Sequence, residues 1–164
     1  MTHTIFEKTD QLIEMVKTRK PALFYAVIAY RNEDVVERLQ RKMNLGREEA
    51  DVLFTDLLKF LALCGVRRLH ATEYSLVPPK NIDEAWHHFL LFTREYADFC
   101  MEFFGAFIHH QPSTSRTQLR GNRIPDAIAL AEDVFGSVSS NWSSHWLESA
   151  EECGGSTNCQ VCYK

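Results

Sequence analysis

Histidine and aspartate side chains that could bind a metal ion gather in the segment 81–112 of the chain. Asp83 precedes His87 by four residues, so on a helix the two side chains share one face. At that spacing the carboxylate can orient the imidazole ring as a metal ligand or as a base. The alternative is a solvated helix face with an ordinary side-chain pair. Apolar Trp86 and Leu90 beside His87 favour the first interpretation, because a covered imidazole needs partners for its ring nitrogens.

Two adjacent histidines, His109 and His110, follow Gly105 and stand just before Pro112. At the end of a helix their side chains would point about 100° apart, so that one could face inward and the other outward. They could instead cap backbone carbonyl groups at the negative end of the helix dipole. We expect at least one of the two to be a ligand.

Three of the five cysteines form the motif Cys153-x5-Cys159-x2-Cys162 near the end of the sequence. A C-x2-C pair is a common zinc clamp, because two thiolates at that spacing can reach one tetrahedral ion. The second C-x2-C pair of a four-cysteine site is absent, so Cys153 and a histidine would have to complete the shell. The histidine candidates are His87, His109, His110 and His145. A three-cysteine iron–sulfur cluster, a dithiol redox pair and a tail without a role are alternatives.

Together these patterns predict one metal site with zinc as the favoured ion and another transition metal as the alternative, because mixed nitrogen and sulfur ligands suit zinc. The predicted ligands are Asp83, His87, His109, His110, Cys153, Cys159 and Cys162.

Composition and charge are ordinary for a globular protein. Of 164 residues, 45% are hydrophobic and 24% charged, and the net charge is −4. The missing basic character argues against a nucleic-acid partner.

No apolar run reaches the roughly 20 residues of a membrane helix, and the first residues do not have the pattern of a signal peptide. We therefore expect a cytoplasmic protein whose cysteines are not in structural disulfides, and Cys64 to be a buried apolar residue.

Helical periodicity dominates the sequence and predicts a mainly α fold, a compact bundle of five to seven helices. Helices are expected over 8–18, from Pro21 through the apolar residues that follow, and over 33–43, 47–64, 81–104 and 126–135. Gly65 is expected to end one helix, Asn81 to cap another and Gly105 to end it. Extended or loop structure is expected over 66–80, 111–125 and the last dozen residues. The predicted organisation is a helical domain over 1–150 and a cysteine-containing tail over 151–164.

The helix predicted over 81–104 has a broad aromatic face, which we expect to lie in the core. Its members are Phe89, Phe92, Tyr96, Phe99, Cys100 and Phe103. Cys100 is then a buried, inert thiol, and the alternative is a reactive cysteine of an enzyme.

Four pieces of this region together resemble a known pattern: I-D-E-x-W-H at 82–87, Y-x3-C at 96–100, F-G at 104–105 and H-H-x-P at 109–112. Over residues 50–112 the chain resembles the glycine-rich domain-containing protein-like family, without its glycine-rich tract. Plant relatives often carry a second histidine where this chain has Phe89, so a ligand role does not carry over there. The resemblance implies motif positions at Asp83, Trp86, His87, Tyr96, Cys100 and Gly105, and no established reaction.

The main hypothesis from the sequence is a small cytoplasmic metal-binding helical protein of unestablished activity. A shell filled by protein ligands would make the ion structural, whereas a bound water would allow hydrolytic or lyase chemistry. The alternatives are a protein-interaction module without a metal and a thiol- or metal-dependent enzyme. The expected partners are a metal ion and, in the second case, another protein, with no nucleic acid and no membrane.

Overall fold

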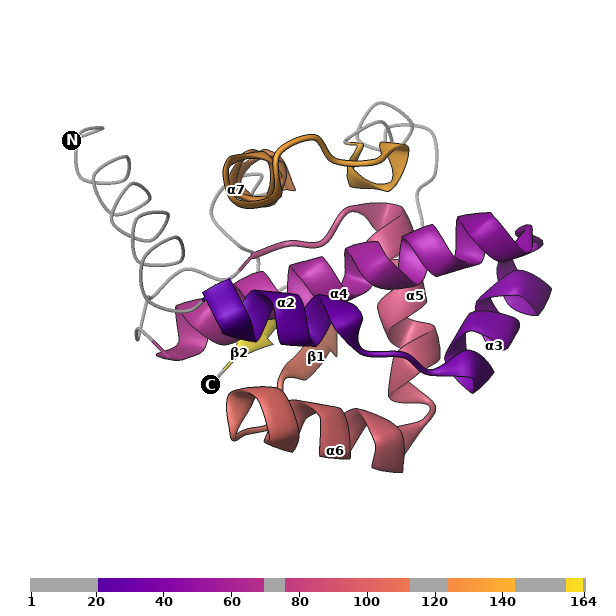
Figure 1. Cartoon of the computed structure of the whole chain (residues 1–164), viewed down its shortest axis with the longest axis horizontal. Coiled ribbons are helices and arrows are strands. Elements are labelled where there is room, and N and C mark those ends of the chain that lie inside the picture. The colour runs from indigo at the N-terminus through magenta and orange to yellow at the C-terminus, as the bar shows by residue number, and fades with distance from the viewer. Residues whose placement is uncertain (1–20, 70–75, 113–123, 144–158, 164) are drawn as a thin grey trace.

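The computed structural model describes residues 21–69, 76–112, 124–143 and 159–163, and it describes their side chains except at 21, 67–69, 111–112, 124–126 and 159–163. This part of the chain contains six α-helices, a short 3-10 helix and two strands (Figure 1). They are α2 (Pro21–Ala29), α3 (Glu33–Met43), α4 (Arg47–Leu69), α5 (Lys80–Leu90), α6 (Thr93–Phe104), β1 (His109–Pro112), α7 (Ile124–Phe135), η1 (Ser140–Trp142) and β2 (Cys159–Tyr163). The predicted mainly α bundle is confirmed. The helix predicted over 8–18 lies outside the described residues.

Helix α4 is the centre of the bundle and contacts α2, α3, α5, α6, α7 and η1. Figure 1 shows it crossing the middle of the molecule, with α7 on one side and α6 on the other. Its central turns are buried, including Leu57, Leu58, Phe60 and Leu61. An element buried on this scale is stabilised mainly by the apolar surface that it removes from water. Among the described residues, no helix combines the length and the apolar character that crossing a membrane requires.

Gly65 does not end α4, as the sequence had suggested, because the helix continues to Leu69. The reason for a glycine here is tertiary. A Cβ atom at position 65 would lie 2.3 Å from Cδ1 of Phe104, so the aromatic ring of α6 occupies the space of a side chain. The expected extended segment 66–80 is correspondingly wrong at its start, and the structure describes no residues between 70 and 75.

The helix predicted over 81–104 is two helices, separated by Leu91 and Phe92. Phe92 has φ −88° and ψ 65°, outside the helical region, and its N–H donates to the carbonyl of Phe89 at 3.0 Å.

Asn81 is not the N-cap, because α5 begins at Lys80. The side-chain amide nitrogen of Asn81 instead donates to Oδ1 of Asn141 at 3.3 Å. Gly105 ends α6 in the left-handed conformation with φ 66°, as expected for a C-cap glycine.

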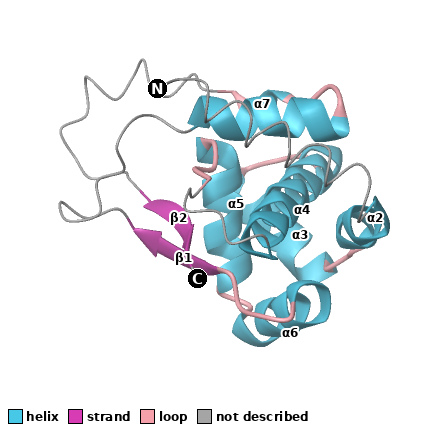
Figure 2. Ribbon diagram, turned by 90° about the vertical axis from the view of Figure 1, so that its left-hand side faces the viewer, coloured by secondary structure: helices cyan, strands magenta, loops and turns pink. Residues whose placement is uncertain are grey.

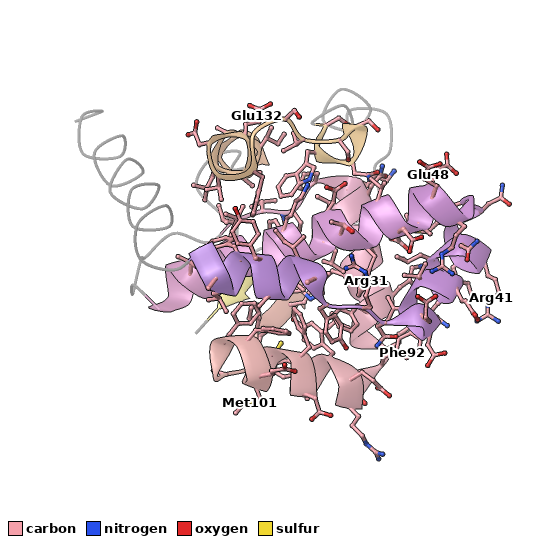
Figure 3. All side chains as sticks on the ribbon, viewed as in Figure 1. Arg31, Arg41, Glu48, Phe92, Met101 and Glu132 are labelled. Carbon is pink, nitrogen blue, oxygen red and sulfur yellow. The ribbon has the colours of Figure 1, made fainter. Side chains whose placement is uncertain are left out.

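The predicted aromatic face does lie in the core. Phe89, Tyr96, Phe99 and Cys100 are buried, and Phe92 and Phe103 pack partly buried against them. Figure 3 shows ring side chains filling the space between α6 and the pair α2 and α4, whereas Met101 points outward. The turn at Leu91 and Phe92 therefore does not remove α6 from the aromatic core.

The strands β1 and β2 pair in antiparallel orientation beside α5 (Figure 2). The register places His109 opposite Tyr163, His110 opposite Cys162 and Pro112 opposite Cys159, with an irregularity between His110 and Pro112. Two expectations are corrected here. His109 and His110 lie on a strand and not at a helix end, and residues 159–163 form a strand and not a loop. The division into domains at residue 150 stays a prediction.

Candidate metal centre

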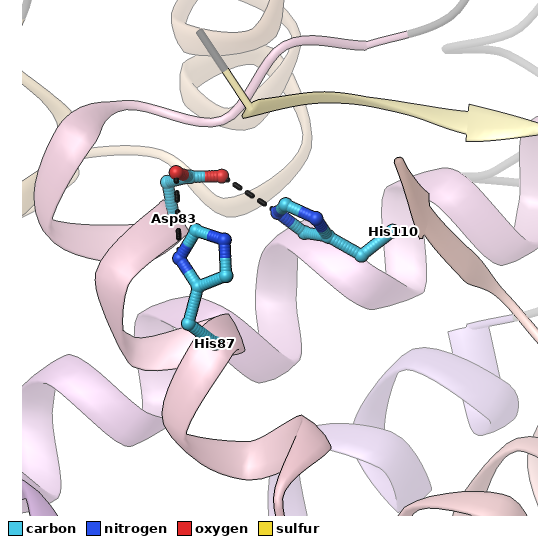
Figure 4. A group of neighbouring side chains, drawn as sticks. All are labelled: Asp83, His87 and His110. Carbon is cyan, nitrogen blue, oxygen red and sulfur yellow. Dashed lines mark hydrogen bonds and ion pairs between the residues drawn. The ribbon is translucent and has the colours of Figure 1, made fainter. Parts of the chain in front are cut away.

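Helix α5 and strand β1 together bring three potential metal ligands to one place. Asp83 lies in the first turn of α5, and His87 follows one turn later on the same face. His110 comes from β1, which runs beside this helix. Figure 4 shows the carboxylate of Asp83 and the imidazole rings of His87 and His110 converging. The sequence predicted the first two residues as a pair, and the fold adds the third.

The three side chains are close enough to share one ion. Oδ1 of Asp83 lies 2.8 Å from Nε2 of His110, and Oδ2 lies 3.7 Å from Nδ1 of His87. The centroids of the two imidazole rings are 4.4 Å apart. One donor atom from each residue lies within 4.8 Å of the other two. Ligands bonded at about 2.0–2.2 Å to a zinc ion are themselves separated by roughly 3–3.5 Å. The distances of 2.8 Å and 3.7 Å lie on either side of that range, and they run to different oxygen atoms of Asp83.

The three side chains differ in their exposure to solvent. The side chain of His110 is 3% exposed, that of Asp83 18% and that of His87 38%. The buried imidazole is thus held by the protein, whereas the His87 side of the cluster is accessible to an ion and to water. Two histidines and one carboxylate with open positions form a donor set that suits zinc or iron(II).

His109, the fourth ligand candidate in the body of the chain, lies away from this cluster. Successive side chains of a strand point to opposite faces, so His109 is exposed while the side chain of its neighbour His110 is buried. The ring of His109 packs against Phe107, with 4.8 Å between centroids. The expectation that one histidine of the pair faces inward is met, by strand geometry and not by a helix.

The structure does not describe the side chains of the three cysteine ligands that the sequence predicts. Cys159 and Cys162 lie in β2, where only the backbone is described, and Cys153 lies outside the described residues. Their part in a metal shell stays a prediction.

Cys64 is disulfide-bonded, which overturns the expectation of a thiol there, although it is buried as predicted. Cys100 is buried, as predicted.

His88 is the next residue of α5, but it faces a different environment. Its Nε2 lies 3.6 Å from Oε1 of Glu84, and its Nδ1 is buried without a hydrogen-bond partner in the part of the chain that the structure describes. Burial lowers the pKa of His88 below its ordinary value, and the carboxylate of Glu84 opposes this effect in part. Among the described residues, His88 belongs to no group of three potential metal ligands.

A cavity of about 700 Å³ lies along α4 and is also lined by residues 137–139. Its buried polar group is Asp56, which is 1% exposed. Oδ2 of Asp56 accepts hydrogen bonds from Ser139 Oγ at 2.5 Å and Asn141 Nδ2 at 3.0 Å, and Lys59 Nζ lies 3.6 Å from Oδ1. The carboxylate therefore anchors η1 to α4, and its charge is already balanced.

A family model matches residues 25–124, which is more than half of the chain. The chain belongs to the UCP032817-like family. This finding corrects the assignment suggested by the sequence pattern, because the matching family is not the glycine-rich domain-containing one. The matched segment contains Asp83, His87 and His110 and ends before the three cysteines near the end of the sequence. No curated protein and no solved structure matches the chain.

Proposed function

We propose that this protein binds one divalent transition-metal ion through Asp83, His87 and His110, with zinc as the favoured ion. The observation that carries the proposal is the convergence of one carboxylate and two imidazoles, with one donor atom of each within 4.8 Å of the others. One carboxylate oxygen with two imidazole nitrogens is a donor set that divalent transition metals favour. The segment matched by the family model contains all three donors, which supports a site in the helical body and not in the tail.

The competing explanation is a set of hydrogen bonds that ties β1 to α5 without an ion. It accounts for the 2.8 Å contact between Asp83 and His110. It does not require a second imidazole next to the first, whereas an ion does. The partial exposure of His87 also suits a ligand that closes on an ion arriving from solvent.

Three protein ligands with solvent on one side leave room for a water molecule. That is the arrangement of catalytic zinc sites, in which the bound water has a pKa near 7. Hydrolytic or lyase chemistry is therefore the activity that we would test first after ion binding has been established. A shell completed by cysteine thiolates would instead make the ion structural.

The test is metal binding by protein purified without a histidine tag and freed of metal by a chelator. Isothermal titration with zinc chloride, and with iron(II) under anaerobic conditions, should give about one equivalent of bound ion. The variants Asp83→Asn and His87→Ala should lose affinity by at least about 100-fold, more than is typical for the loss of an outer-shell partner. Asp83→Asn keeps the shape of the side chain, and His87 is partly exposed, so both proteins should fold.

His109→Ala is the matched control, because it removes an exposed imidazole from the same strand. Its affinity should equal that of the unmodified protein. Binding that is absent with both ions, or that is as strong in Asp83→Asn as in the unmodified protein, would contradict the proposed site. Tighter binding of iron(II) than of zinc would keep the site and change its ion.

A further inference from the structure

The hydroxyl group of Tyr96 connects three elements around the candidate metal centre. The indole Nε1–H of Trp86 donates to this hydroxyl at 3.0 Å, and the hydroxyl donates to the backbone carbonyl of Ile108 at 2.7 Å. Trp86 and Tyr96 are fully buried, and Ile108 is 2% exposed. The chain of hydrogen bonds thus runs from α5 through α6 to the residues just before β1, without access to water.

The two residues at the ends of this hydrogen-bond chain are both connected to His110, one through the backbone and the other by direct contact. Ile108 precedes His110 by two residues, so fixing its carbonyl fixes the start of the strand that carries the imidazole. Trp86 contacts the imidazole directly, with 4.4 Å between ring centroids and 82° between ring planes. The same indole is therefore held by Tyr96 at its nitrogen and packs edge-to-face on His110.

We infer that Tyr96 is a positioning residue for the candidate metal centre. Through its hydrogen bonds with Trp86 and Ile108, it sets the place and orientation of His110 relative to Asp83. This inference rests on the proposed function as far as metal affinity is concerned. Its geometric part, the placement of the imidazole, holds for the metal-free protein as well.

The chemistry of the phenol suits this role. Burial, and to a lesser extent the neighbouring Cys100, raises the pKa of Tyr96 well above its ordinary value. The hydroxyl therefore keeps its proton and continues to donate to Ile108. Its removal would leave a buried N–H on Trp86 and a buried carbonyl on Ile108 without this partner, which is costly in an apolar interior. Both groups would then shift to find new partners, and His110 would shift with them.

The first test compares Tyr96→Phe with Tyr30→Phe. Tyr30 is a matched control, because its ring also packs on Phe99, at 4.9 Å, while its hydroxyl lies 3.5 Å from the amide nitrogen of Asn32, away from β1. We expect zinc affinity to fall about 10–100-fold in Tyr96→Phe, as is typical when an outer-shell partner is lost. In Tyr30→Phe it should change by less than about threefold. Circular dichroism should show the same helical content in both variants.

The second test needs no metal. Long-range proton–nitrogen NMR spectra of the metal-free protein report the tautomer and surroundings of each histidine ring. The signals of His110 should shift in Tyr96→Phe and stay in place in Tyr30→Phe. If no ion binds to the unmodified protein, the proposed function fails, and this spectrum alone decides the positioning role of Tyr96.

Unchanged affinity and unchanged His110 signals in Tyr96→Phe would overturn the inference. So would equal losses in Tyr96→Phe and Tyr30→Phe, because these would indicate a general loss of core packing. If Tyr96→Phe does not fold, Trp86→Phe replaces it, since this change removes the N–H donor and leaves the bond between Tyr96 and Ile108 intact. Because Trp86 also contacts the imidazole directly, the deciding signal is then that of the Ile108 carbonyl, which should shift through its hydrogen bond with Tyr96, and an unchanged Ile108 carbonyl counts against the inference.

Discussion

Asp83 and His110 are 27 residues apart in the sequence, yet Oδ1 of the aspartate lies 2.8 Å from Nε2 of the histidine. The contact joins the first turn of α5 to β1. It makes the candidate site a product of tertiary structure, because no local spacing rule brings these two residues together. The integrity of the site therefore depends on the aromatic core that holds α5 and α6, and on the strand pairing that holds β1.

Replacing Phe99 with alanine should destabilise the protein by about 3–5 kcal/mol, the usual cost of truncating a buried aromatic side chain. Phe99 is 1% exposed, and its ring packs on those of Tyr30, Phe103 and Phe104. Urea unfolding measures the change. Met101→Ala is the control on the same helix, because Met101 is 58% exposed and its truncation should change the free energy of unfolding little. A loss below about 1 kcal/mol for Phe99→Ala would mean that the core packing is wrongly described.

Gly65→Ala should destabilise the protein, although alanine normally stabilises the interior of a helix by about 1 kcal/mol relative to glycine. The added Cβ would lie 2.3 Å from Cδ1 of Phe104, so the ring or one of the helices must move. We expect a net loss of about 1–3 kcal/mol in urea unfolding, as for other overpacked cores. Combining Gly65→Ala with Phe104→Leu should lose less than the two single changes add up to, because the smaller side chain removes the clash. Stabilisation by Gly65→Ala alone would contradict the close approach of α4 and α6.

The raised pKa of Tyr96 predicts a loss of stability in alkali. In the unfolded chain the phenol ionises near pH 10, whereas in the folded protein it must stay neutral to higher pH. The unfolded state therefore releases its proton first, and the contribution of Tyr96 to stability is present below pH 10 and declines as pH rises above it. Urea midpoints measured from about pH 9 to 11 should fall more steeply for the unmodified protein than for Tyr96→Phe. Equal slopes would show that Tyr96 is not protected from ionisation.

The position of a helix and the face that it buries could be predicted from the sequence, because both follow from the local spacing of apolar residues. The helix from Glu33 to Met43 has its cap at Asn32 and three buried residues at helical intervals, and it lies where the sequence predicted it. The break at Phe92 could not be predicted, since neither glycine nor proline marks it. The end of α4 could not be predicted at Gly65 either, because a glycine, which is typical of a helix end, is here required by the ring of Phe104.

The site was predictable only in part. Asp83 and His87 lie on one helix four residues apart, and this pairing follows from helical geometry. The placement of His110 depends on a strand whose partner lies some fifty residues further along the sequence, and short strands of this kind carry little periodic signal. Tyr96 was assigned to the core from its helical spacing, and the aromatic pattern gave no indication that its hydroxyl bonds to the residue that precedes His109.

Deleting residues 153–164 should weaken metal binding and leave most of the helical content intact. The deletion removes β2, which pairs with β1 through backbone hydrogen bonds and places Cys162 opposite His110. Without this partner strand, β1 would be held at its start by Tyr96 and along its length by the contact of His110 with Asp83. The imidazole would then have more freedom, and part of the binding free energy would be used to order the strand. Circular dichroism and a zinc titration of the truncated and full-length proteins measure both effects.

A control separates strand pairing from ligation by thiolates. Changing Cys159 and Cys162 to serine keeps the backbone that pairs with β1 and removes both sulfur atoms of the C-x2-C pair. If β2 acts only by holding β1, the serine variant should bind zinc about as well as the full-length protein, and the truncated protein should bind it more weakly. If both lose affinity to the same extent under reducing conditions, in which no disulfide contributes, the cysteines are ligands, as the sequence pattern predicted. Unchanged affinity in the truncated protein would contradict both explanations, and it would leave Asp83, His87 and His110 as a site that α5 and the start of β1 hold without help from the tail.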